Sequence, residues 1–377
     1  MSEELKPGDR GDVVYSITNT LTRLGFLTAP KDLYDNAVEV AIRAFQQERG
    51  LTATGIANAM TIRALDEARW KLGDRTLQFQ PAGQLMRGDD VATLQSRLVD
   101  MGFDCGRVDG IFGARTENAV KDFQKSAGVK VDGLCGPATV MALMRLMRTV
   151  SGGAPTALRD QAQREKRGPV LADKVIVLDP SWGGSTVGRE ANGVNESSIV
   201  FDVAQRIEGR LIALGVSVFL TRNTERSPLE PERISFANSV SADLVISLHV
   251  DSYKNDRAQG VATYFYGSDH HGIHSIVGER FATLVQREIC ARTDLVNLRT
   301  HAKTWDMLRL TKAPTVRVDL GYISNSHDAE RLADPQFRDL IAEAFVIAIQ
   351  RLYLSAEDDA KTGTLRVEDL RKAGIRR

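Results

Sequence analysis

The chain has 377 residues, with 49 Lys and Arg, 49 Asp and Glu, and a formal net charge of zero. This length predicts two or three domains, and the 42% hydrophobic content predicts packed cores rather than a disordered chain. The balanced charge argues against a nucleic-acid binder with a broad basic face, and no apolar stretch approaches the ~18 residues of a membrane helix.

The N-terminus and the cysteines predict a cytoplasmic protein. Residues 1–10, MSEELKPGDR, lack the basic and apolar regions of a secretory signal. Cys105, Cys135 and Cys290 are an odd and sparse set, which fits a reducing compartment without a disulfide framework. A Cys105–Cys135 bridge within one small domain is the alternative.

The first part of the chain contains one small unit twice. Residues 11–26 align without gaps on residues 88–103, an offset of about 77 residues. We therefore expect repeats at 6–70 and 84–148, each with a helix, a Gly-rich loop, a second helix ending near Phe-Gln, a turn and a short third helix. In the second copy, Thr116 follows the turn sequence DGIFG and is the expected N-terminal residue of the next helix.

These copies resemble the three-helix peptidoglycan-binding domain of bacterial cell-wall hydrolases. The second copy matches the motif of that domain nearly throughout, whereas the first has KDLYDN at 31–36 in place of the Asp-Gly-x-Phe-Gly loop. The resemblance implies these candidate peptidoglycan-binding residues: Asp109, Gly110, Phe112, Gly113 and Thr116. The alternative is that they only build the small helical fold.

The composition changes after the second copy. Residues 151–172 are charged and punctuated by Gly and Pro, which is typical of a linker. From 173 to 354, short β-branched runs alternate with segments of helical period, which predicts an α/β domain with a mostly parallel sheet flanked by helices. Residues 355–377 are polar and charged, and we expect a flexible tail.

The segment 173–354 resembles the zinc-dependent N-acetylmuramoyl-L-alanine amidases over nearly all of its length. The matching motifs occur in the order of that family: Val177-Leu178-Asp179-Pro180, Asn195-Glu196, Thr221-Arg222, Arg233, Ala237-Asn238, Ala242–His249 and Pro314–Asn325. The whole architecture, with two repeats before the amidase domain, is similar to the actinobacterial CwlM-type amidase homologues.

The resemblance implies a metal site that this sequence does not complete. The family holds Zn²⁺ through a His two residues after Asp-Pro, a Glu that opens the next helix and a His after the third strand, and a nearby Glu is the general base. Here the first ligand is replaced by Trp182, whose indole N–H is only a donor. Glu196 and His249 remain, and Asp319 stands at the base position with one methylene less. We expect a degenerate site with no cofactor.

Two alternatives concern the altered positions. His270, His271 and His274 are candidates for a replacement zinc ligand, and otherwise belong to a polar exposed turn. Trp182 either fills the space left by the metal, with its N–H bonded, or packs in a groove for a ligand or partner.

Three functions are compatible with this sequence. The first is an active zinc amidase that hydrolyses the muramoyl–L-alanine bond of peptidoglycan. The second, which we favour, is a catalytically inactive cytoplasmic regulator of peptidoglycan precursor synthesis. The third is a sensor that binds muropeptides or lipid-linked precursors without cleaving them.

The resemblance to the CwlM-type homologues implies the partners of the regulator. These are UDP-N-acetylglucosamine enolpyruvyl transferase and a serine/threonine kinase; we expect no nucleic-acid partner and no transmembrane segment. Thr362 and Thr364 lie in the tail after acidic residues and are the expected phosphorylation sites. Their phosphates would attract an Arg-rich surface or a phosphothreonine-binding domain protein, whereas the alternative is an ordinary hydrophilic terminus.

Overall fold

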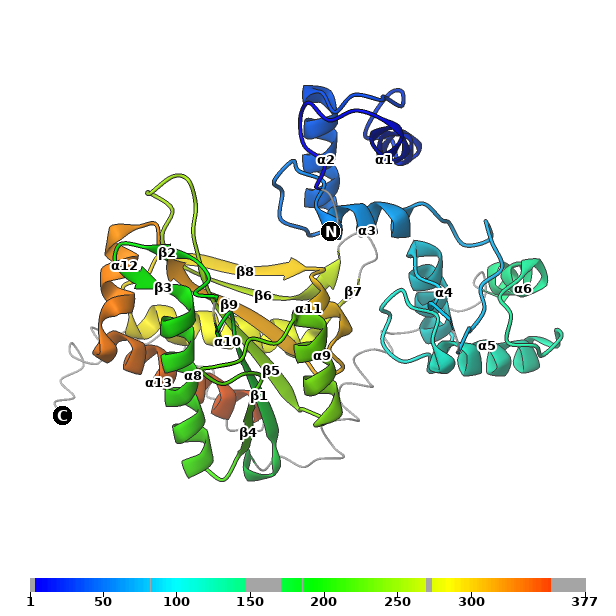
Figure 1. Ribbon diagram of the computed structural model, residues 1–377. Coiled ribbons are helices and arrows are strands. Elements are labelled where there is room, and N and C mark those ends of the chain that lie inside the picture. The colour runs from blue at the N-terminus through cyan, green and yellow to red at the C-terminus, as the bar shows by residue number, and fades with distance from the viewer. Residues whose placement is uncertain (1–3, 82, 147–170, 185, 269–272, 354–377) are drawn as a thin grey trace, which may run out of the picture. The chain divides into compact units, whose positions relative to one another are not determined.

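The computed structural model describes residues 4–81, 83–146, 171–184, 186–268 and 273–353 (Figure 1). Within these ranges the chain forms two compact units, an N-terminal helical unit and a C-terminal unit built on a sheet. The predicted tail 355–377 lies outside the described residues, as does the predicted linker apart from its last two residues, which enter the short 3-10 helix Leu171–Asp173.

Each N-terminal copy contains three helices, as the repeat predicts. The first has α1 (Asp12–Arg23), α2 (Asn36–Glu48) and α3 (Ala59–Ala68). The second has α4 (Asp89–Asp100), α5 (Ala114–Ala127) and α6 (Pro137–Leu146). Equivalent aromatic pairs pack edge to face in the two cores, Phe26 on Phe45 at 5.7 Å and Phe103 on Phe123 at 5.6 Å between ring centroids. The two copies therefore share their packing as well as their sequence.

A buried glutamine side chain organises the loops of the second copy. Gln95 Oε1 accepts hydrogen bonds from the backbone N–H groups of Asp109 (3.1 Å) and Gly110 (2.8 Å), and its Nε2 donates to Ile111 O and Thr116 Oγ1. Gln124 repeats the arrangement one loop later, with these partners: Asp132, Gly133, Leu134 and Thr139. The Asp-Gly turn is thus folded around a buried amide whose donors and acceptor are all satisfied.

The expected start of the helix at Thr116 is wrong. Helix α5 begins at Ala114 after Gly113, so Thr116 lies in its first turn. The reason is its hydroxyl, which faces inward, accepts from Gln95 Nε2 at 3.1 Å and leaves the side chain only 2% exposed.

The first copy keeps only one of the two glutamines. Gln46 Nε2 donates to Ile56 O (2.9 Å) and Thr61 Oγ1 (2.9 Å), and its Oε1 accepts from Gly55 N (2.9 Å). At the position of Gln95 the first copy has Thr18, whose shorter side chain bonds the N–H and C=O of Lys31. The first copy thus holds this loop through a threonine hydroxyl instead of a glutamine amide.

We predict that Gln46→Ala destabilises the first copy by about 2–4 kcal/mol, because it leaves buried polar groups of the 55–61 loop without partners. The matched control is Gln47→Ala, the exposed neighbour on the same helix, which should change stability by less than about 0.5 kcal/mol. Hydrogen exchange of peptides that cover residues 51–61 measures the effect. Equal protection in the two variants would contradict this role.

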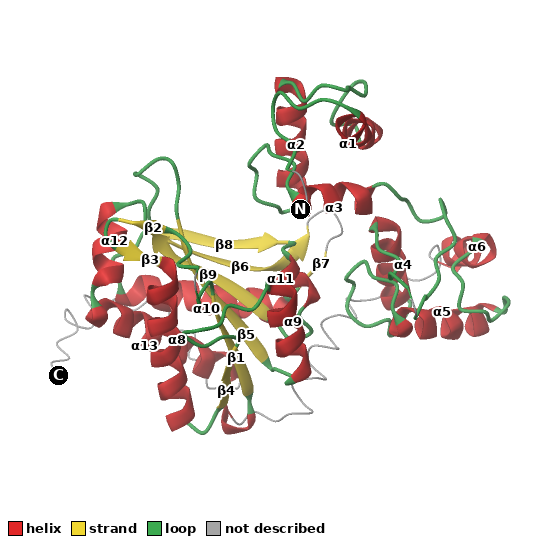
Figure 2. Ribbon diagram, in the orientation of Figure 1, coloured by secondary structure: helices red, strands yellow, loops and turns green. Residues whose placement is uncertain are grey.

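The C-terminal unit is built on a mostly parallel sheet (Figure 2). Its strands are β1 (Val175–Pro180), β4 (Ser217–Leu220), β5 (Leu244–Asp251), β6 (Val261–Ser268), β7 (Ile273–His274), β8 (Asn297–Lys303) and β9 (Thr315–Tyr322). Their order is β4-β1-β5-β9-β6-β7, with β8 also on β6. Strands β4, β1, β5 and β9 pair in parallel, and β6 is antiparallel to β9 but parallel to β8. The strand runs that the sequence predicts at 175–178, 216–220 and 244–248 are confirmed: each strand begins within one residue of its run, and β1 and β5 extend further, to Pro180 and Asp251.

Helices cover the two faces of the sheet unequally. The helices are α8 (Glu196–Ala213), α9 (Glu230–Ser239), α10 (Ile276–Arg292), α11 (Asp306–Leu310), α12 (Ser326–Ala333) and α13 (Pro335–Tyr353). One face packs Leu178, Leu248 and Val318 into the large core with α8, α10 and α13. On the other face, Val177 and Val245 form a small cluster with α9. Side chains alternate along a strand, so residues 179, 247, 249, 317 and 319 continue this second face beyond that cluster.

No helix in the described part of the chain is long and apolar enough to cross a membrane. Cys105 and Cys135 are free and buried and Cys290 is free and half-buried, so the alternative Cys105–Cys135 bridge is not formed.

Candidate functional site

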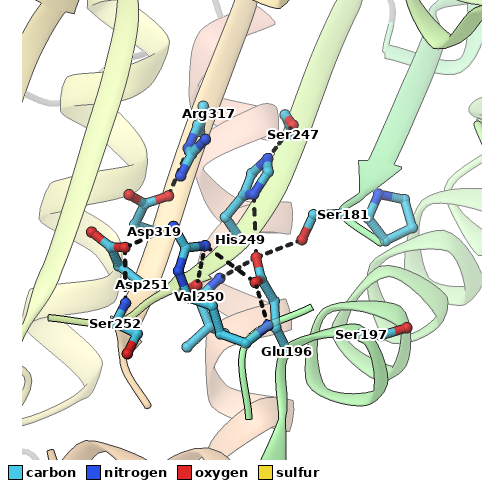
Figure 3. A network of polar contacts seen from close by, with 12 residues as sticks. Ser181, Glu196, Ser197, Ser247, His249, Val250, Asp251, Ser252, Arg317 and Asp319 are labelled. Atoms are coloured by element: carbon cyan, nitrogen blue, oxygen red, sulfur yellow. Dashed lines mark hydrogen bonds and ion pairs between the residues drawn. The ribbon is translucent and has the colours of Figure 1, made fainter. Parts of the chain in front are cut away.

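Polar side chains gather where β1, β5 and β9 end, on the sheet face that α9 leaves open (Figure 3). In open parallel sheets this is the edge at which ligands bind, because the loops that follow the strands diverge there. The sequence motifs place Asp179, Glu196, His249 and Asp319 at this edge, and the structure brings them together.

Asp179 is a buried carboxylate at the end of β1 that holds the neighbouring strands of the site together. Its side chain is fully buried and accepts hydrogen bonds from Thr221 Oγ1 (2.6 Å), Ser247 Oγ (2.7 Å) and Arg233 Nη1 (2.7 Å). Burial alone would raise the pKa of Asp179, but the Arg233 charge and these hydrogen bonds outweigh it, so the pKa lies below its usual range. The carboxylate ties β1, β4 and β5 together.

Arg222 holds the loop that follows β1. Its Nε donates to Pro180 O (2.9 Å), its Nη2 donates to Ser181 O (3.2 Å) and Ser197 O (3.0 Å), and its guanidinium stacks on Phe201. Burial lowers the pKa of Arg222 to about 10, so it stays charged at neutral pH. The backbone of the loop is therefore fixed independently of any metal.

Trp182 lies at the surface of the site. Trp182 is 43% exposed, which argues against the first of the two alternatives, that its ring fills the space left by the metal. Its backbone takes a left-handed φ of 57°, and its ring edge packs on Gly188, where an added Cβ would lie 2.5 Å from Trp182 Cδ1. Ser181, the preceding residue of this loop, donates from its Oγ to Glu196 Oε1 at 2.7 Å.

Glu196 is the most heavily contacted carboxylate of the site. Its Oε1 accepts from Ser181 Oγ (2.7 Å) and Val250 N (3.2 Å), and its Oε2 accepts from Arg189 Nη1 (3.2 Å) and Arg189 N (3.3 Å). Burial raises the pKa of Glu196, but His249, Ser181 and Arg189 outweigh it and lower the pKa to about 2. Glu196 is therefore a buried anion.

His249 lies between Glu196 and Ser247 (Figure 3). Its Nδ1 is 3.3 Å from Glu196 Oε1, and its Nε2 is 3.1 Å from Ser247 Oγ. Burial and the nearby Arg317 charge lower the pKa of His249, so the imidazole is neutral at pH 7. Both expected ligands are thus adjacent.

Asp319, at the base position, is paired with Arg317. Arg317 Nε donates to Asp319 Oδ1 at 2.8 Å, and its guanidinium lies over the Trp305 ring at 4.7 Å. Asp319 pairs in register with His249 on the neighbouring strand. The salt bridge occupies one carboxylate oxygen, which leaves less of Asp319 available to accept a proton from water.

Two charged residues of the site were not found from the sequence. Arg189 Nη1 donates to Glu196 Oε2 and to Val250 O (3.1 Å), and its Nη2 pairs with Asp251 Oδ1 at 3.0 Å. Arg189 is the only basic residue between Trp182 and Glu196 in the sequence, which is a signal that could have pointed to it. Asp251 lies two residues after His249 on the same strand face, which its spacing predicts.

The described residues do not fit a zinc site. Among them, no group of three or more His, Cys, Asp or Glu side chains is placed to hold a metal ion. His274 is 49% exposed and pairs with Glu279, so it supplies no third ligand; His270 and His271 lie outside the described residues. Glu196 and His249 are two donors where a zinc site uses at least three protein ligands, and both oxygens of Glu196 already have partners.

The peptidoglycan-binding candidates all take part in the loop built around Gln95. Phe112 and Thr116 are buried in the core of the second copy, and Gly110 has the left-handed φ of 73°. Asp109 Oδ1 accepts from Ile111 N, and Gly113 precedes helix α5. A role of these residues in binding stays a prediction.

The fold and this set of side chains define an amidase scaffold preceded by two peptidoglycan-binding-type repeats. The family model for N-acetylmuramoyl-L-alanine amidases matches residues 176–351, and the model for a peptidoglycan binding domain matches 10–65 and 87–143. The chain belongs to the N-acetylmuramoyl-L-alanine amidase family.

Individual relatives agree with this family. The chain is 44% identical to the N-acetylmuramoyl-L-alanine amidase CwlM of Mycobacterium tuberculosis, over 98% of this chain and 94% of the relative. It is 26% identical to the N-acetylmuramoyl-L-alanine amidase LytC of Bacillus subtilis, over 52% of this chain and 38% of the relative. Among solved structures, the amidase AmiC2 of Nostoc punctiforme aligns with 26% identity and a TM-score of 0.43, over 48% of this chain and 96% of that chain.

We predict that Asp179→Asn destabilises the C-terminal unit. It should also make the free energy of unfolding depend less on pH in acid. Because the folded pKa of Asp179 is depressed below 3.8, its contribution is present above that pH and is lost as the pH falls through the lower folded value. Urea unfolding between pH 5 and pH 2 measures this. The control is Asp339→Asn, whose side chain is 45% exposed in a surface network and is screened by water. An equal acid dependence in the two variants would count against this role of Asp179.

Proposed function

We propose that this chain is a catalytically inactive amidase homologue that acts as a cytoplasmic regulator of peptidoglycan precursor synthesis. The observation that carries the loss of catalysis is the ligand set. Glu196 and His249 are adjacent, but the third position is Trp182, whose indole nitrogen has no lone pair for a metal. Without zinc, the scaffold has no means to lower the pKa of a water molecule toward neutrality.

The state of Asp319 supports the same conclusion. Its carboxylate is shorter than glutamate by one methylene, and Arg317 holds it at 2.8 Å. Misplacement of a catalytic group by ~1 Å costs about 10²-fold in rate. The missing zinc ligand at position 182 and the paired carboxylate of Asp319 together favour a protein that binds without catalysing hydrolysis.

The regulatory role rests on the resemblance to the CwlM-type homologues. The proposed target is UDP-N-acetylglucosamine enolpyruvyl transferase, the enzyme of the first committed step of precursor synthesis. A serine/threonine kinase would phosphorylate Thr362 or Thr364, which lie outside the described residues. The phosphate would recruit an Arg-rich surface or a phosphothreonine-binding domain protein to the tail.

Two alternative functions also have observations in their favour. An active zinc amidase is favoured by family membership and by the 3.3 Å between Glu196 Oε1 and His249 Nδ1. A sensor of muropeptides or lipid-linked precursors is favoured by the exposed Trp182 ring beside Glu196, because aromatic faces pack against sugars and apolar groups.

We expect the purified chain to contain far less than one zinc per molecule and to release no peptide from peptidoglycan. Elemental analysis and chromatography of the digest measure the two quantities. One zinc per chain, with cleavage that His249→Ala abolishes, would contradict the proposal and favour the active amidase. Muropeptide binding without cleavage would favour the sensor. Zinc regained by Trp182→His with Asp319→Glu would mean that only these two positions had been lost.

We expect Thr362→Ala/Thr364→Ala to abolish phosphorylation of the chain by the kinase, since both candidate acceptors are removed. Phosphopeptide mass spectrometry after incubation with kinase and ATP measures this. The control is Thr52→Ala, an exposed threonine of the first repeat, which should leave labelling unchanged. Labelling that persists elsewhere in the double variant would rule out control through these sites.

A further inference from the structure

A guanidinium group occupies the centre of the degenerate site. Arg189 binds Glu196 Oε2 through Nη1 at 3.2 Å and Asp251 Oδ1 through Nη2 at 3.0 Å, and it also donates to the carbonyl of Val250. The Arg189 guanidinium therefore bridges the carboxylates of Glu196 and Asp251, which both lie near His249.

The local backbone builds this cation into the site. The hairpin of β2 (Glu190–Ala191) and β3 (Val194–Asn195) returns the chain so that Glu196 N donates to Arg189 O at 2.9 Å. Arg189 N in turn lies 3.3 Å from Glu196 Oε2. Arg189 and Glu196 are thus held side by side by main-chain bonds as well as by charge.

Among the described residues, Arg189 is the arginine that pairs with Glu196, whereas Arg317 pairs with Asp319. A buried carboxylate without a compensating charge is unstable, so a protein that loses a metal from such a site needs another positive group there.

We propose that Arg189 takes over the electrostatic role of the metal and thereby excludes zinc from the site. This inference rests on the proposed function as a zinc-free homologue. It adds a second barrier to metal binding: restoring the ligand at position 182 is not sufficient while the guanidinium occupies Glu196 Oε2.

Trp182 and Glu196 both lie beside Gly188. An added Cβ at Gly188 would lie 2.5 Å from Trp182 Cδ1 and 3.0 Å from Glu196 Oε2, so the indole edge and the carboxylate border the same glycine. A histidine introduced at position 182 would have a path to a metal shared with Glu196 and His249. A divalent ion at that point would lie next to the Arg189 charge and be repelled by it.

The test compares zinc binding by calorimetry and elemental analysis in four full-length proteins. They are the wild type, Trp182→His, Trp182→His/Arg189→Ala and Trp182→His/Arg257→Ala. Arg257 is an exposed residue of the loop after β5, so its removal changes the net charge equally without touching Glu196. We expect about tenfold or greater tightening of zinc binding when Arg189 is removed from the Trp182→His variant, and no tightening when Arg257 is removed.

The outcomes separate this inference from the proposed function. Stoichiometric zinc in Trp182→His alone would overturn the role of Arg189 and leave a zinc-free wild type intact. Stoichiometric zinc in the wild type would overturn both. Equal affinities in the Arg189 and Arg257 double variants would overturn the inference as well.

A second measurement covers the case in which Arg189→Ala folds poorly. If Arg189 compensates Glu196, then Glu196→Gln should restore part of the melting temperature that Arg189→Ala loses, because the neutral amide needs no cation. Arg189→Gln, which keeps a polar side chain without the charge, should be rescued in the same way. Strictly additive losses would contradict the proposal.

Discussion

A buried carboxylate must have its charge compensated, and the site is organised around the compensation of Glu196. The side chain opens helix α8 at the carboxyl edge of the sheet and is fully buried. In a zinc amidase the metal would supply the positive charge. Here Ser181, the N–H of Val250, His249 and Arg189 surround the carboxylate instead, and they lower its pKa to about 2. The scaffold of an amidase therefore persists with its electrostatics redistributed among side chains.

Other buried polar groups of the chain also have their hydrogen-bond partners within the fold. Asp179 is buried beneath the site because Thr221, Arg233 and Ser247 satisfy it, and Arg222 fixes the loop above. In the second N-terminal copy, the neutral side-chain amides of Gln95 and Gln124 are buried. Each one hydrogen-bonds the backbone groups of a neighbouring loop and so fixes its conformation. Buried polar groups with every partner in place thus determine the loops of both units.

The sequence predicted the architecture well because repeats, strand runs and family motifs are local patterns. Glu196, His249 and Asp319 were correctly placed at one edge since each follows or opens a recognised element. Arg189 was missed because its importance comes from a two-strand hairpin that returns it to Glu196, which no periodicity reveals. The position of Thr116 within helix α5 likewise depends on a hydrogen bond from a distant residue, Gln95.

The central proposal is that Arg189 takes the place of the metal in this member of the amidase family. The most direct test is a crystal structure of the wild-type protein grown with excess zinc, with anomalous scattering recorded at the zinc absorption edge. We predict guanidinium density between Glu196 and Asp251 and no anomalous peak within bonding distance of Glu196 and His249. An anomalous peak coordinated by both residues, with Arg189 displaced, would contradict the account.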